Sequence, residues 1–89
     1  MKIHENILST VGNTPLVKLN RLVAELPCTV LAKVETFNPG NSIKDRMALW
    51  VLRSAYARGE LRPGDEIAEA TSGNTGISIA AMGRALGHA

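Results

Sequence analysis

The chain has 89 residues with a formal net charge of +2, and 45% of its residues are hydrophobic and 20% charged. This composition is typical of a globular protein and excludes disordered and fibrous chains. Acidic and basic residues alternate along the chain without the basic stripe of a nucleic-acid-binding protein, and no apolar run could span a bilayer or serve as a signal peptide. We therefore expect a cytoplasmic protein with no nucleic-acid or membrane partner.

A chain of this length can bury only a small core, and only three aromatic residues are present to fill it. Cys28 is the single cysteine, so no internal disulfide can form, and we expect it to be a small buried hydrophobe. His4 and His88 stand at opposite ends of the chain without a second ligand at a zinc spacing. We expect both histidines at the surface or the termini, and no metal site.

The first half of the chain contains two predicted strands. Residues 1–10 have a weak helical spacing and predict a short helix. Residues 15–19 and 30–35 are rich in β-branched side chains with partial alternation, which indicates strands. The turn formers at 37–41 must end the second strand.

The second half predicts two helices around a short strand. Ser42 and Asp45 form a capping arrangement that begins a helix running to Gly59. Residues 66–70 predict a short strand, and 75–86 a helix that Gly87 ends. This order of elements favours an α/β fold with crossover connections.

Lys44 breaks a local rule, because it lies in the first turn of the stronger helix, where the helix dipole disfavours a cation. A neutral amine is what Schiff-base chemistry with a carbonyl requires. The alternative is an ordinary solvated lysine that pairs with Asp45 or Glu35.

Residues 71–76 break local rules as well, because two glycines, three hydroxyl residues and an amide stand between a strand and a helix. Backbone N–H groups at such a helix start point at any anion, and the side chains of Thr71, Ser72, Asn74 and Thr75 add further donors. The loop matches neither nucleotide-binding glycine pattern. The alternative to a carboxylate or phosphate site is a simple turn with Asn74 or Thr75 as N-cap.

An amine nucleophile and an anion cradle in one α/β unit are the minimum for a pyridoxal phosphate enzyme that acts on an amino acid. The sequence also resembles one such family, the cysteine synthase and cystathionine β-synthase family, in three motifs that occur in the family's order. These are VGNTPLV at 11–17, NPGNSIKDR at 38–46 and EATSGNTG at 69–76.

This resemblance implies the N-terminal portion of a fold-type II pyridoxal phosphate enzyme, a three-layer αβα fold with a mainly parallel sheet. Lys44 would hold the cofactor and act as general base on the substrate Cα proton, and Asn74 would bind the cofactor's ring oxygen. The substrate carboxylate would lie on the loop residues Thr71, Ser72, Gly73, Asn74 and Thr75. The reaction implied is β-replacement on an activated serine by sulfide or a thiol, in an enzyme that is commonly a homodimer.

The resemblance also implies how the chain divides. Residues 1–37 would carry strands that pair with the larger domain, and 38–89 would begin the smaller, substrate-binding domain. The family's phosphate-binding loop and the residue facing the pyridine nitrogen are expected further along the chain and are absent from these 89 residues. We therefore expect this chain alone to be a portion of the enzyme that neither completes the cofactor site nor turns over substrate.

Asn41 departs from the family pattern, since many relatives have glycine or alanine there. Three alternatives to a cysteine synthase remain open at this point. They are a cystathionine β-synthase acting on serine and homocysteine, a threonine synthase or dehydratase, and a non-catalytic module whose apolar helix around Trp50 packs on a partner.

Overall fold

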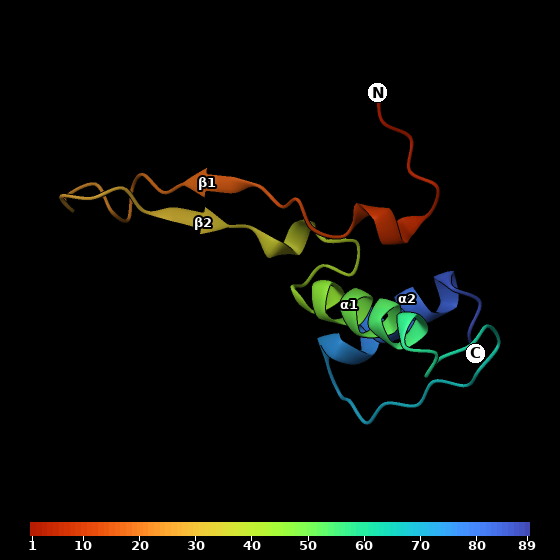
Figure 1. The fold of residues 1–89 in the computed structure, drawn as a ribbon. Helices are drawn as coiled ribbons and strands as arrows, with labels where there is room; N and C mark the ends of the chain where they lie inside the picture. Colours follow the sequence, from red (N-terminus) through yellow and green to blue (C-terminus); the bar gives the residue numbers. More distant parts are fainter.

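Two helices form the body of the protein, and the computed structural model describes them together with the rest of residues 1–89. Helix α1 is Lys44–Ala57 and helix α2 is Asn74–Ala85, which confirms both predicted helices. Each helix buries one stripe at helical spacing: Asp45, Ala48 and Leu52 on α1, and Ser78 and Met82 on α2. The stripes face each other, since Ala48, Leu52 and Met82 form one cluster and Ser78 bonds to Asp45. The two helices lie side by side in Figure 1. Neither helix has the length and apolar composition needed to cross a bilayer.

The core between the helices is small. Its buried hydrophobic side chains are Leu8, Ala48, Leu52 and Met82. Leu8 comes from a single 3-10 turn, η1 (Ile7–Thr10), which the Asn6 side chain caps by accepting from the Leu8 N–H at 2.9 Å. The helix predicted over residues 1–10 is therefore reduced to one turn, because only Leu8 of this segment finds apolar neighbours.

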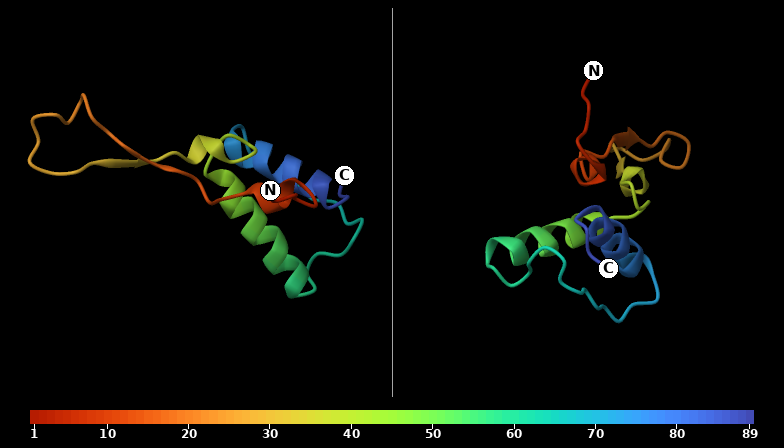
Figure 2. Two further views of the ribbon diagram at one scale, coloured as in Figure 1. Left: turned by 90° about the horizontal axis from the view of Figure 1, so that it is seen from above. Right: turned by 90° about the vertical axis from the view of Figure 1, so that its right-hand side faces the viewer.

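A β-hairpin extends away from the helices as an arm (Figures 1 and 2). Strand β1 (Leu16–Lys18) pairs antiparallel with β2 (Leu31–Lys33), so that Leu16 faces Lys33 in the register. The arm gives the molecule extents of 54 × 36 × 20 Å and a radius of gyration of 16.7 Å. A compact chain of this length would have about 12 Å. Both predicted strands are confirmed, but the side chains of Leu16, Val17 and Leu31 are exposed.

The strand predicted over residues 66–70 does not form, and no parallel pairing occurs. Strands β1 and β2 pair only with each other and lie in the arm. Residues 66–70 therefore have no neighbouring strand with which to form hydrogen bonds. What remains of the predicted pattern is the half-buried Ile67, which packs against the core. The structure is thus a small α/β portion in which the helices are formed and the parallel sheet is not.

The two helix ends were predicted with different success. Gly87 has φ +89° and ends α2 as expected, because a left-handed residue after the helix favours glycine. The capping arrangement at α1 is only half right. The Ser42 hydroxyl accepts from the Lys44 N–H at 3.2 Å, but the Asp45 carboxylate does not return to Ser42 and instead accepts from the Gly40 N–H.

The expectation for Cys28 is wrong, and that for His88, a terminal residue, is incomplete. Cys28 is exposed, because it lies in the loop that joins β1 to β2, away from the apolar core. His88 is buried rather than at the surface. Its Nδ1 lies 2.7 Å from the Asp65 carbonyl oxygen, which can only accept, so Nδ1 carries the hydrogen and Nε2 is free to accept from the Tyr56 hydroxyl.

A polar cluster joins the base of the arm to α1. The Arg46 guanidinium donates to the Glu35 carboxylate and, at 3.1 Å, to the Thr14 hydroxyl, which itself donates to Glu35. Lys33 donates to the Thr14 carbonyl at 2.6 Å. The hydrogen bonds from Arg46 and then Thr14 lower the pKa of Glu35 from 4.5 to about 2. This carboxylate therefore stays charged far into the acid range.

The lowered pKa of Glu35 predicts how stability depends on pH. The unfolded chain takes up the proton at a higher pH than the folded protein, so the stabilisation is complete above pH 4.5 and is lost as the pH falls towards 2. Glu35→Gln should therefore be less stable than the wild type at pH 7, and the gap should close between about pH 5 and pH 2. Chemical unfolding across this range measures the gap.

The exposed Glu66, which makes no ion pair, provides the control. Glu66→Gln should stay close to the wild type at every pH. A stability gap for Glu35→Gln that does not change with pH would contradict the role of Arg46 as the charge partner.

Candidate functional site

Both helices begin at the same end of the body. Figures 1 and 2 show α1 and α2 running in the same direction from neighbouring first turns and diverging toward their carboxyl ends. The Ser78 hydroxyl in α2 donates to the buried Asp45 carboxylate in the first turn of α1 at 2.6 Å. This hydrogen bond holds the two starts together, and the positive ends of two helix dipoles therefore lie close to each other.

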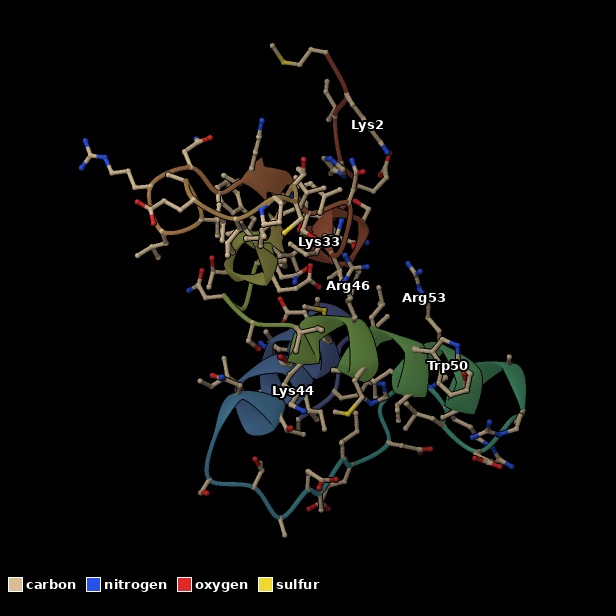
Figure 3. All side chains as sticks on the ribbon, turned by 90° about the vertical axis from the view of Figure 1, so that its left-hand side faces the viewer. Lys2, Lys33, Lys44, Arg46, Trp50 and Arg53 are labelled. Atoms are coloured by element: carbon tan, nitrogen blue, oxygen red, sulfur yellow. The ribbon has the colours of Figure 1, made fainter.

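Lys44 is the first residue of α1, and its side chain is exposed at this shared end (Figure 3). The preceding turn closes through a 2.8 Å hydrogen bond from the Asn41 N–H to the Asn38 carbonyl. Asn41 has φ +62°, a left-handed conformation that asparagine tolerates better than most residues. The turn thus sets where the Lys44 amine begins.

The loop before α2 presents its polar groups to solvent. Thr71, Ser72, Gly73 and Asn74 are exposed, and Thr75 is half-buried. The Thr71 oxygen caps the helix start by accepting from the N–H groups of Gly73 at 3.3 Å and Gly76 at 3.1 Å. Because the oxygen accepts both bonds, the hydroxyl hydrogen remains available to an outside acceptor.

Two backbone donors at the start of α2 have no acceptor in the protein. The N–H groups of Asn74 and Thr75 make no hydrogen bond to backbone or side chain, and neither can bond within the helix because they are its first residues. Together with the hydroxyl hydrogens of Thr71 and Ser72, they form a group of donors that fits a carboxylate or phosphate. The structure therefore brings Lys44 and residues 71–75 to one end of the molecule.

Gly76 explains why the loop can turn so tightly. A Cβ at this position would overlap the methyl group of Thr71, so only glycine lets the Thr71 oxygen reach the start of α2. No similar restriction applies to Gly73, around which no other atom lies within 4 Å of a Cβ. Gly73 is open on the side where a ligand would approach.

A cavity along α2 borders the loop before that helix. A cavity of about 400 Å³ lies between the extended residues 67–71 and α2, and Lys44 does not line it. The cavity lies where residues 67–71, which pair with no strand, leave part of α2 exposed. The Lys44 amine lies outside this cavity, which meets the candidate site only at Thr71 and Gly76.

Sequence reasoning missed the residues that hold the site together, above all Asp45 and Ser78. A signal for both was present. Asp45 stands in the same helical stripe as Ala48 and Leu52, and Ser78 in the same stripe as Met82. A polar residue within each of two facing apolar stripes indicates a buried hydrogen bond between them.

Comparison with known proteins identifies the family. The family of pyridoxal-phosphate dependent enzymes matches residues 7–89, nearly the whole chain. This chain belongs to that family. The relatives include cysteine synthase 1 of Neurospora crassa, 49% identical over 97% of this chain and 23% of its own length. O-ureido-L-serine synthase of Streptomyces lavendulae is 50% identical over 99% of this chain and 27% of its own length.

Cystathionine beta-synthase of Rattus norvegicus is 48% identical over 98% of this chain. Among solved structures, O-ureido-L-serine synthase superposes with a TM-score of 0.87, and a lysine-to-alanine variant of it with O-ureido-L-serine bound superposes with 0.91. The chain spans about a quarter of the length of the cysteine and O-ureido-L-serine synthases it matches. The expected family and fold are thus confirmed for this portion, and so is the cofactor class.

The residues present fit the pyridoxal phosphate on which this family depends. The cofactor's aldehyde requires a primary amine, and Lys44 supplies one in an exposed position next to the start of α2. The unpaired N–H groups of Asn74 and Thr75 are suitable donors for a carboxylate or phosphate.

The cap at α2 gives a test of the loop. Thr71→Val removes the oxygen that accepts from Gly73 and Gly76 and should cost about 1 kcal/mol of stability. It should also speed amide hydrogen exchange in residues 71–77. Thr71→Ser keeps the acceptor and should behave like the wild type.

Thr36→Val is the matched control, because the exposed Thr36 side chain makes no hydrogen bond. Equal exchange rates in Thr71→Val and Thr36→Val would show that Thr71 does not cap the helix.

Proposed function

We propose that the intact protein catalyses a pyridoxal phosphate-dependent β-replacement, in which sulfide or a thiol displaces the β-substituent of an activated serine such as O-acetylserine. With sulfide the product is cysteine. The observation that carries the proposal is the shared helix end, where the Lys44 amine and the donors of residues 71–75 are held together by the Asp45–Ser78 hydrogen bond. The names of the relatives, all synthases that act on amino acids, support it.

We assign the chemistry to this chain's residues as follows. The Lys44 amine would hold the cofactor until the substrate amine takes its place. The freed amine would then take the proton from the substrate Cα and return it once sulfur has bonded to Cβ. Between these transfers the bond from Cβ to the leaving group breaks, and acetate departs when the substrate is O-acetylserine. When bound, pyridoxal phosphate supplies the sink for the electron pair released at Cα.

The loop positions the substrate in this proposal. The N–H groups of Asn74 and Thr75 and the hydroxyls of Thr71 and Ser72 bind the carboxylate, and Gly73 leaves room for it. The Asn74 side chain binds the cofactor's ring oxygen. Binding of O-ureido-L-serine to a lysine-to-alanine variant of one relative is in keeping with a lysine that acts on the amino acid.

The division of the chain is part of the proposal. Residues 1–37 carry the arm, whose exposed Leu16, Val17 and Leu31 are suited to packing on the larger domain of the intact enzyme. Residues 38–89 begin the smaller domain, with Leu8 of the first part packed on its helices. We further propose that the intact enzyme is a cytoplasmic homodimer and that the 89 residues alone do not turn over substrate.

A substrate panel separates this function from its alternatives. The intact enzyme is incubated with O-acetylserine, serine or threonine, each with and without sulfide or homocysteine, and the products are identified by mass spectrometry. Cysteine formed from O-acetylserine and sulfide is the expected result. Cystathionine from serine and homocysteine would make it a cystathionine β-synthase, and a 2-oxo acid with ammonia from threonine would make it a dehydratase.

Lys44→Ala tests the role of the amine directly. The variant of the intact enzyme should lose the visible absorbance of lysine-bound pyridoxal phosphate. Turnover should fall roughly 100-fold to 10,000-fold, the range expected for a lost general acid-base group. Lys18→Ala is the control, because Lys18 is exposed on β1 in the arm, away from the helix starts. An interaction module would keep its partner in the Lys44→Ala variant, and retained absorbance would contradict the assignment.

A further inference from the structure

The Asp45 carboxylate is completely buried in the first turn of α1, although the proposed chemistry does not use it. It accepts from the Gly40 N–H with one oxygen and from the Ser78 hydroxyl, at 2.6 Å, with the other. A buried carboxylate is costly unless donors satisfy it, so these two bonds are obligatory partners and not incidental contacts.

The contact with Asp45 requires glycine at position 40. A Cβ at position 40 would overlap the Asp45 carboxylate, so only glycine lets the backbone come close enough to donate. The turn that contains Gly40 leads directly to Lys44. Asp45 therefore fixes this turn from the inside.

Ser78 transmits the same constraint to the loop. It stands four residues after Asn74 in α2, one helical turn from the proposed carboxylate donors. Lys44 is the residue next to Asp45. One carboxylate thus spans the two parts of the site, with the amine on one side and the anion-binding helix start on the other.

Stability alone does not require this arrangement. A buried polar pair adds little net stability compared with well-packed apolar side chains of similar volume, whereas it fixes geometry by its directional bonds. Apolar residues at both positions would hold the helices together but would not set the distance between Lys44 and the α2 start.

We propose that Asp45 and Ser78 are positioning residues, which hold the Lys44 amine at the distance from the substrate-binding loop that proton transfer at Cα requires. This inference rests on the proposed function. Loss of the Asp45–Ser78 bond should therefore slow proton transfer while the substrate and the cofactor still bind.

Ser78→Ala in the intact enzyme removes the bond across the helices and keeps the one to Gly40. We expect kcat per bound cofactor to fall about tenfold and the KM for the amino acid to stay within twofold. The kinetic isotope effect with α-deuterated substrate should rise, and the induced circular dichroism of bound pyridoxal phosphate should change. Ser54→Ala is the matched control, since Ser54 lies on α1 and its side chain makes no hydrogen bond; it should leave all four quantities unchanged.

Asp45→Asn provides rescue by a conservative change. Its amide oxygen can accept from the Gly40 N–H while its NH₂ donates to the Ser78 oxygen, so kcat should stay within about threefold of the wild type. Asp45→Ala should lose as much as Ser78→Ala or more, and should also speed hydrogen exchange at Gly40. If Ser78→Ala does not fold, Ser78→Cys replaces it, because the thiol keeps a weak donor of similar size. The changes in kcat, isotope effect and circular dichroism should then have the same direction but be smaller.

Two results would overturn the inference. The first is a Ser78→Ala enzyme that melts at a lower temperature but keeps the wild-type kcat per cofactor, isotope effect and circular dichroism, because Asp45 and Ser78 would then only stabilise the fold. The second is an Asp45→Asn enzyme as impaired as Asp45→Ala. Failure of the proposed function is seen separately: the wild-type enzyme would then turn over no amino acid in the substrate panel, and the inference would fall with it.

Discussion

The buried Asp45 carboxylate requires hydrogen-bond donors, and this requirement determines how the two helix starts pack together. Asp45 has no exposed surface, and a charge in that position is tolerated only because Gly40 and Ser78 donate to it. Meeting this need places the turn before α1, the first turn of α1 and the second turn of α2 in contact. The position of the candidate site is a consequence, because Lys44 and the loop before α2 are attached to these same turns.

The first turn of α1 also connects the site to the arm. Successive residues of a helix point about 100° apart, so Lys44, Asp45 and Arg46 face three directions. Lys44 faces solvent at the shared helix end, Asp45 faces the core, and Arg46 reaches the Glu35 and Thr14 side chains at the base of the hairpin. Three consecutive residues thereby join the site, the core and the arm.

The sequence predicted what depends on local pattern. Apolar spacing was enough to find both helices, and the left-handed preference of glycine was enough to find the end of α2 at Gly87. The start of α1 was found for a partly wrong reason, because the Asp45 carboxylate serves Gly40 and Ser78 instead of a capping box. Because Asp45 lies in the buried stripe of α1, it is better interpreted as a core carboxylate that needs hydrogen-bond donors than as part of a capping box.

The errors concern residues whose environment depends on distant segments. His88 is buried by Tyr56 and Asp65, and residues 66–70 lack a neighbouring strand. The connection that contains this segment still has a structural role. Helix α1 is about 21 Å long at 1.5 Å per residue, and the chain must return that distance if α2 is to begin beside Lys44. The connection at 58–73 is long enough to cover that distance without forming a sheet.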